Sequence, residues 1–248
     1  MISIKSVTEI DKMRKAGEIT ALTHRLLEEN ICDGVTTGEL DRIAYEFIKS
    51  KGAVPSFLNY SGYPNSVCLS VNDVVIHGIP GKQIIRSGDI VSVDIGAYLN
   101  GYHADQAATY PCGQVSAEAQ RLIDVTKQSF FEGIKNAREG NRISDISNAV
   151  QKYVEQNGFS VVRDYVGHGV GRELHEAPEV PNYGKANKGV RLYTGMTLAV
   201  EPMVNQGKYD VYRLKDGWTV KTVDGSLSAH YEHSIAVTKN EPVLLTIV

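Results

Sequence analysis

Acidic residues interrupt apolar, β-branched segments of this sequence, where an ionised carboxylate is costly to bury. Asp94 lies within IVSVDIGAY, and Asp105 follows eleven residues later, across an Asn-Gly pair typical of a hairpin turn. Glu201 in TLAVEPMVN and Glu232 in YEHSIAV have similar surroundings. His168 stands between glycines, which let the backbone approach another group closely. We therefore expect four carboxylates and one imidazole in buried segments.

A metal site accounts for this set better than separate structural roles do. A single carboxylate in a strand is more often hydrogen-bonded or paired with a cation, but these apolar runs contain no Lys or Arg. Four carboxylates alone would raise one another's pKa values, whereas two divalent cations would balance their charge. Oxygen ligands with one imidazole and no thiolate suit Co²⁺, Mn²⁺, Fe²⁺ or Zn²⁺. Two such ions about 3.5–4 Å apart activate a shared water, so the pattern predicts hydrolysis of an acyl or phosphoryl group.

Two blocks of helices followed by strands must position these residues. Helical periodicity, a capping box and helix-ending glycines predict helices at 8–29, 36–51, 116–139 and 144–157. Alternating and apolar runs predict strands at 66–71, 73–80, 89–98, 108–110, 159–166, 196–204, 218–223, 233–239 and 242–248. The repeated order suggests a duplicated half, and no segment has the composition of a linker. We expect one α/β domain spanning 1–248, with antiparallel rather than doubly wound sheets.

Composition excludes several other classes of protein. Net charge is −3 with acids and bases interspersed, which gives no electrostatic footprint for nucleic acid or an anionic membrane. The sequence has no apolar run long enough to span a bilayer and no signal-peptide pattern at its start. The three cysteines have no metal-ligand spacing, which indicates a reduced, cytoplasmic protein.

The five candidate ligands, in this order and in long matching contexts, resemble those of the type I methionine aminopeptidases. The matching segments are NDVVIHGIP, SVDIGAYLNGYHAD, YVGHGVGRELHEAP, GMTLAVEPMV and WTVKTVDGSLSAHYEHSIAV. The resemblance implies a pita-bread fold, in which two pseudo-symmetric α/β halves with antiparallel sheets and flanking helices enclose a dinuclear metal site. It also implies removal of the initiator methionine from nascent chains with a small second residue, through hydrolysis by a metal-bound water.

The resemblance assigns a role to each ligand. Asp94 would bind one divalent ion, and His168 and Glu201 would bind the other. Asp105 and Glu232 would bridge the two ions. Glu201 would also carry a proton from the water to the departing amine.

Further residues match substrate-binding positions of the family. His77 and His175 would hydrogen-bond the substrate peptide and the tetrahedral intermediate, an effect worth about 10²–10³ in rate for each. The methionine pocket would be lined by Tyr60, Tyr63, Cys68, Leu174 and Trp218. Leu174 departs from the Phe that relatives often have, so the shape of the pocket should differ. The remaining histidines, His24, His103, His230 and His233, are interpreted as structural.

The resemblance also bears on further ligands and partners. The family often binds a monovalent cation through backbone carbonyls, here near Asn72, Val74 and Ser228. The implied partner is the N-terminal methionine of a nascent peptide, and the implied state is a cytoplasmic monomer. The role would bring the chain to the ribosome, although no basic patch marks that contact.

Two other interpretations stay open at this point. The first is a proline-specific relative, an Xaa-Pro aminopeptidase or prolidase; those proteins usually carry an extra N-terminal domain, and Tyr63 and Trp218 here lie in methionine-pocket contexts. A metal-free hydrolase of the creatinase type is disfavoured because all five ligands are present. The second is a non-catalytic pita-bread protein that binds a partner. Such proteins typically lose several ligands and gain charged tails, and neither change is seen here.

Overall fold

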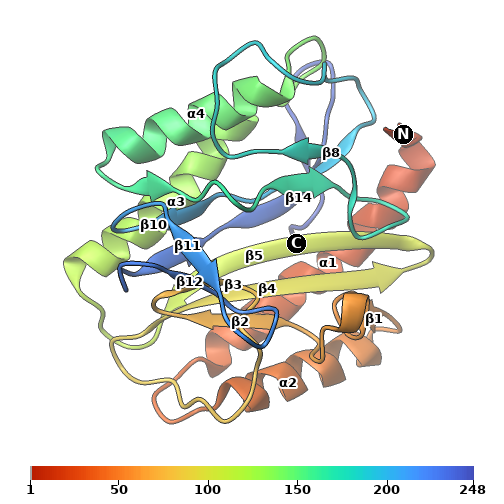
Figure 1. The fold of residues 1–248 in the computed structure, drawn as a ribbon. Helices are drawn as coiled ribbons and strands as arrows, with labels where there is room; N and C mark the ends of the chain where they lie inside the picture. The colour runs from red at the N-terminus through yellow and green to blue at the C-terminus, as the bar shows by residue number, and fades with distance from the viewer. Residues whose placement is uncertain (1) are drawn as a thin grey trace.

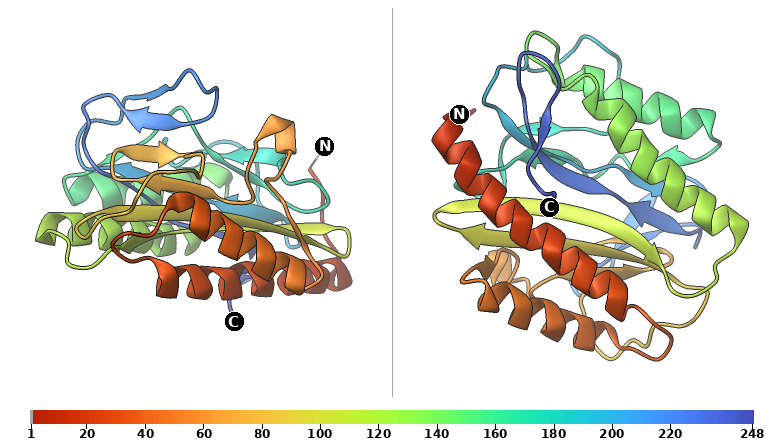
Figure 2. Two further views of the ribbon diagram at one scale, coloured as in Figure 1. Left: turned by 90° about the horizontal axis from the view of Figure 1, so that it is seen from below. Right: turned by 180° about the vertical axis from the view of Figure 1, so that it is seen from behind.

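A central antiparallel sheet joins the two halves of the chain in the computed structural model, which describes residues 2–248 (Figure 1). Its nine strands follow the order β1-β4-β5-β14-β9-β7-β8, with β2 paired to β4 and β15 paired to β14. Four helices cover one face of this sheet, and a β-hairpin and a short 3₁₀ helix lie over the other face (Figure 2). The strands of this sheet therefore have helices packed on one face, and the hairpin and the 3₁₀ helix on the other.

The helices follow the predicted order, with one end corrected. They are α1 (Val7–Asn30), α2 (Thr37–Ser50), the 3₁₀ helix η1 (Tyr60–Gly62), α3 (Ala117–Ile134) and α4 (Ile143–Gln156). The predicted capping box of α2 is present, with the Thr36 hydroxyl and the Glu39 carboxylate each accepting from the other's backbone N–H. The predicted end of α3 at residue 139 was wrong, because Glu139 has left the helix and donates its N–H to the Thr238 carbonyl. No helix within residues 2–248 is long and apolar enough to cross a membrane.

The strands are more numerous than predicted and most are shorter. The strand predicted at 108–110 is the exception: it spans residues 102–111, because it pairs with the preceding strand over its whole length. In the first half the strands are β1 (Val54–Pro55), β2 (Cys68–Val71), β3 (Val74–Ile76), β4 (Ile90–Leu99) and β5 (Tyr102–Pro111). In the second half they are β6 (Ser160–Val161), β7 (Gly167–Gly169), β8 (Glu176–Val180), β9 (Thr197–Val200), β10 (Met203–Asn205), β11 (Val211–Arg213), β12 (Val220–Thr222), β13 (Ser228–His230), β14 (Glu232–Ala236) and β15 (Val243–Leu244). The continuous strand expected at 196–204 is split at Pro202, which cannot donate a ladder hydrogen bond.

The predicted hairpin around the Asn-Gly pair is confirmed. β4 and β5 pair over ten residues, from Ile90 opposite Pro111 to Leu99 opposite Tyr102. The two turn residues, Asn100 and Gly101, have φ values of 52° and 85°, as a two-residue hairpin turn of this hand requires. The hairpin fixes the register between the strands that carry Asp94 and Asp105.

Each half has its own apolar core beneath the shared sheet. In the first half, α1 and α2 pack Leu27 and Leu40 with Val91 and Val93 of β4. In the second half, side chains of α3 and α4 pack against β9 and β14. The halves meet where β5 pairs with β14. The predicted duplicated order of helices and strands is therefore confirmed, and the sheet is continuous across the junction.

Candidate active site

The register of the central sheet places three of the predicted ligands on one face. Asp94 on β4 lies opposite Ala107 on β5, and Glu232 on β14 lies opposite the same Ala107 from the other side. Asp105 precedes Ala107 by two residues, and side chains two residues apart in a strand share a face. Cys68 on β2 extends the row, because it pairs with Asp94. Carboxylates from three neighbouring strands thus converge beside one thiol.

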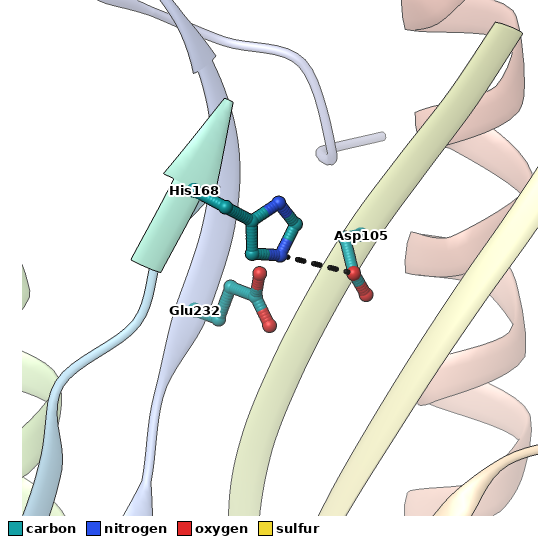
Figure 3. Close-up of side chains that lie close together, drawn as sticks. All are labelled: Asp105, His168 and Glu232. Atoms are coloured by element: carbon teal, nitrogen blue, oxygen red, sulfur yellow. Dashed lines mark ion pairs between the residues drawn. The ribbon is translucent and has the colours of Figure 1, made fainter. Parts of the chain in front are cut away.

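The second half contributes the other two predicted ligands. His168 on β7 lies opposite Ala199 on β9, and Glu201 follows directly after β9. The Nε2 atom of His168 is 3.9 Å from Asp105 Oδ2 and 3.7 Å from Glu201 Oε1. One ligand atom each from Asp105, His168 and Glu232 lie within 4.8 Å of one another, and the three side chains point towards a common centre (Figure 3). The geometry is that of a small cation site.

The orientation of His168 leaves a ligand lone pair free. Its Nδ1 donates to the Gly169 carbonyl at 2.8 Å, so Nε2 faces the carboxylates without a proton. Burial and, to a lesser extent, the nearby His175 together lower the pKa of His168 to about 3. A neutral imidazole with one nitrogen fixed by a backbone carbonyl is the form in which histidine binds metals.

The carboxylates fit a bound cation because several of their oxygens lack any other partner. Asp94 Oδ1, Asp105 Oδ1 and Glu232 Oε1 are buried and form no hydrogen bond within residues 2–248. Burial, together with the neighbouring carboxylates, raises the pKa values of Asp94 and Glu232 well above their usual range. Burial raises the pKa of Asp105 to about 7. Orphaned buried carboxylates are costly, and divalent ions would satisfy all of them.

A single cavity of about 120 Å³ collects every residue for which the sequence predicted a divalent-metal or substrate-binding role. It is lined by Phe57, Tyr60, Tyr63, Cys68, His77, Asp94, Asp105, His168, Leu174, His175, Glu201, Trp218 and Glu232. The carboxylates occupy one end. Cys68, beside Asp94, also packs with Phe57, Tyr63 and Leu174, and Trp218 contacts the Tyr63 ring edge-on at 5.2 Å between centroids. The cavity is therefore polar at one end and apolar at the other.

Two histidines stand between these ends. His77 has φ of 57°, in a left-handed region that is strained for a residue with a side chain, and its ring lies edge-on to Trp218. His175 is held through Nδ1 by the Tyr60 hydroxyl at 2.8 Å. Its ring centroid is 4.1 Å from that of His168. Both imidazoles line the cavity, and His175 lies directly against His168.

One histidine interpreted as structural lies at the site. His230 Nε2 is buried without a hydrogen-bond partner in the described part of the chain, 3.5 Å from Glu201 Oε2. Its position two residues before Glu232 was the available signal, because even spacing favours one face of a strand. The Glu201 backbone is fixed as well, since its carbonyl accepts from Asn182 Nδ2 at 2.9 Å. The sequence pattern did not single out Asn182.

The other three histidines have structural partners. His24 contacts the Gln106 carbonyl and the Tyr110 hydroxyl, His103 contacts Ser56 Oγ, and His233 contacts Thr246 Oγ1.

The residues considered for a monovalent cation lie near one another, since the Ser228 N–H donates to the Asn72 carbonyl at 2.9 Å. Asn72 and Val74 flank the start of β3. All three cysteines are free thiols.

Comparisons with known proteins agree with this geometry. The model of metallopeptidase family M24 matches residues 11–239. The methionine aminopeptidase of Clostridium perfringens is 56% identical over the whole of both chains. The crystal structure of methionine aminopeptidase from Rickettsia prowazekii superposes with a TM-score of 0.98 at 43% identity, over 100% of each chain.

Proline-specific enzymes share the fold at a greater distance. The prolidase from Pyrococcus horikoshii has a TM-score of 0.79 at 22% identity, and the match covers 98% of this chain but 63% of the prolidase chain. That likeness shows the common pita-bread architecture alone. The methionine aminopeptidases of Clostridium perfringens and Rickettsia prowazekii, by contrast, match over their full lengths at 56% and 43% identity. The chain belongs to metallopeptidase family M24 and, within it, to the methionine aminopeptidases.

Proposed function

We propose that this chain hydrolyses the first peptide bond of nascent polypeptides that begin with methionine and have a small second residue. The observation that carries the proposal is the single cavity with a carboxylate–imidazole cluster at one end and an apolar, aromatic pocket at the other. The pocket selects the side chain, and the cluster lies where the following peptide bond would be. Full-length similarity to enzymes named methionine aminopeptidase supports the same reaction.

The pocket suits an unbranched thioether. Tyr63 and Trp218 present aromatic surfaces, which make favourable contacts with sulfur. Leu174 is buried and packs with Phe57, Tyr63 and Cys68 in the apolar part of the cavity. Burial of a methionine side chain contributes about 1.5–3 kcal/mol to binding. The small volume of the cavity leaves room for one such side chain.

The ligand set gives the protein residues defined tasks. Asp94 would hold one divalent ion, His168 and Glu201 the other, and Asp105 and Glu232 would bridge. When bound, the ions supply Lewis acidity and bring the pKa of water towards neutrality. Co²⁺, Mn²⁺, Fe²⁺ and Zn²⁺ all suit these ligands.

Glu201 is the proton carrier in this proposal. Burial raises its pKa well above the ordinary range, so its carboxylate can hold a proton between two steps. His77 and His175 can donate hydrogen bonds to the carbonyl oxygen as negative charge develops there. His175 is oriented for this by the Tyr60 hydroxyl.

The site needs both halves of the chain. Asp94 and Asp105 come from the first half, and His168, Glu201 and Glu232 from the second, which supports a single catalytic domain over the whole sequence. Action on nascent chains would take place in the cytoplasm, beside the ribosome, by a monomer. A monovalent cation near Asn72, Val74 and Ser228 would tie the start of β3 to β13.

A substrate panel tests the proposal. Chelator-treated protein reconstituted with Mn²⁺ or Co²⁺ is incubated with Met-Gly-Met-Met and, separately, with Ala-Pro and Met-Pro. We expect metal-dependent release of methionine from the tetrapeptide, lost in Glu201→Ala. Cleavage confined to the proline dipeptides would move the chain to the prolidase branch. Bound metal with no cleavage of any peptide would favour a non-catalytic binding role.

A further inference from the structure

A second cavity adjoins the first and has no role in the proposal so far. Its volume is about 410 Å³, within the ~300–1,000 Å³ range typical of ligand clefts. It is lined by Ser61, His77, Tyr165, Arg213, Gly217 and Trp218, so it shares His77 and Trp218 with the active-site cavity. Ser61 belongs to η1, and Arg213 and Gly217 belong to the β11–β12 hairpin, which lies over the face of the sheet opposite the helices (Figure 2).

The substrate chain can leave the active site through this second cavity. The methionine pocket is closed by Tyr63 and Leu174, which are 3% and 1% exposed. Under the proposed function, His77 contacts the peptide group that follows methionine. Each further residue extends the chain by at most about 3.6 Å. The third and fourth residues therefore lie past His77, between Tyr165 and the hairpin.

The second cavity presents a cation that the protein itself does not neutralise. The Arg213 side chain forms no ion pair or hydrogen bond with any residue from 2 to 248, and no Asp or Glu lines the cavity. By contrast, Arg42 and Arg172 pair with glutamates at 2.9 and 3.0 Å. A guanidinium presents parallel N–H donors that match both oxygens of a carboxylate.

We propose that the cavity beside His77 is a binding site for the third and fourth residues of the substrate, and that Arg213 favours a carboxylate there. The carboxylate can be an Asp or Glu side chain of a longer chain or the C-terminus of a tripeptide. This inference rests on the proposed aminopeptidase function. Arg213 is exposed, so the preference is modest: an exposed ion pair of about 0.2–1 kcal/mol corresponds to roughly a 1.4- to 5-fold change in kcat/KM.

The test places one negative charge at successive positions of the substrate. C-terminally amidated hexapeptides beginning Met-Ala carry Asp, or Asn as the neutral match, at the third, fourth or sixth position. Met-Ala-Ser is compared as free acid and as amide, which separates the two sources of the carboxylate. Each peptide is assayed with the parent enzyme, with Arg213→Met and with Lys215→Met. Lys215 is the matched control, because it lies in the same hairpin and is exposed but does not line the cavity.

The parent enzyme should prefer Asp over Asn at the third or fourth position by about 1.4- to 5-fold in kcat/KM, with no preference at the sixth. That ratio should fall to one in Arg213→Met and persist in Lys215→Met. A ratio of one at every position in the parent, or equal loss in both variants, would overturn the inference.

A binding measurement tests the Arg213 site separately from the proposed aminopeptidase function. If none of the Met-Ala peptides is cleaved, the proposed function fails. The Arg213 site is then judged by the Nε–H resonance of Arg213 in metal-free protein. It should shift on addition of the third-position Asp peptide more than with its Asn match, and equal shifts would reject the site.

Discussion

Replacing Lys5 with methionine should destabilise the protein and loosen the loop that carries Leu174 and His175. The Lys5 ammonium pairs with the Glu176 carboxylate, and their side chains are only 3% and 12% exposed. The same carboxylate accepts the backbone N–H groups of Arg172 and Glu173 at 2.8 and 3.2 Å. The N-terminal segment thus holds both ends of the turn that places His175 in the cavity.

The expected loss follows from the burial of the pair. Breaking a buried ion pair by removing one partner costs about 3–5 kcal/mol, because the other charge stays buried. Glu176 keeps two backbone donors, so we expect the lower end of that range, about 3 kcal/mol. For a chain of this size a loss of that order lowers Tm by about 6–12 °C. Because Leu174 and His175 both line the cavity, kcat/KM for methionine release should fall as well.

The assay compares the parent with four variants at one fixed metal concentration, since bound metal itself raises stability. Lys5→Met and Glu176→Gln are measured alone and combined, and the double variant should recover part of the loss because no charge is left unpaired. Arg42→Met is the control, because its pair with Glu46 is about 60% exposed on each side and should contribute under about 1 kcal/mol. A Lys5→Met protein no less stable than Arg42→Met would refute the reasoning.

Three further outcomes follow from other parts of the structure. Gly17→Ala should lower stability by about 1–3 kcal/mol in urea unfolding, although alanine normally favours a helix, because the new Cβ would lie 2.0 Å from the Leu245 carbonyl oxygen. His77→Asn should leave Tm nearly unchanged, since asparagine tolerates positive φ, yet reduce kcat/KM by about 10²-fold; an equal fall in Tm and activity would contradict a role for the imidazole. Mn²⁺ affinity, measured by calorimetry, should rise between about pH 6 and pH 8, because burial raises the pKa of Asp105 to about 7 and its proton must leave before metal binds; a flat profile would contradict this.

Sequence patterns located the site better than they located the strands that carry it. Asp94, Asp105 and Glu232 stood out because each interrupts an apolar run, and strand alternation then put them on one face. The fold class and the duplicated order of elements also followed from periodicity and turn residues. Long, regular elements such as α1 and β4 were the ones that periodicity located best, whereas most of β5 was missed.

The short second-half strands could not be read from local sequence. β7 has only three residues, two of them glycine, and it is a strand because β8 and β9 pair with it. The contact between His230 and Glu201 likewise depends on how β13 meets the end of β9, which no local pattern specifies. The ion pair of Lys5 with Glu176 joins residues 171 positions apart. Tertiary packing, rather than propensity, determines these features.

Metal binding by Asp105 and Glu232 tests the central claim most directly. Chelator-treated protein is titrated with Mn²⁺ in a calorimeter, beside the double variant Asp105→Asn, Glu232→Gln and the exposed control Glu46→Gln. We predict saturable binding with release of protons by the parent and by the control, and loss of that binding in the double variant. Unchanged Mn²⁺ binding by a folded double variant would contradict the assignment of these carboxylates as the metal site.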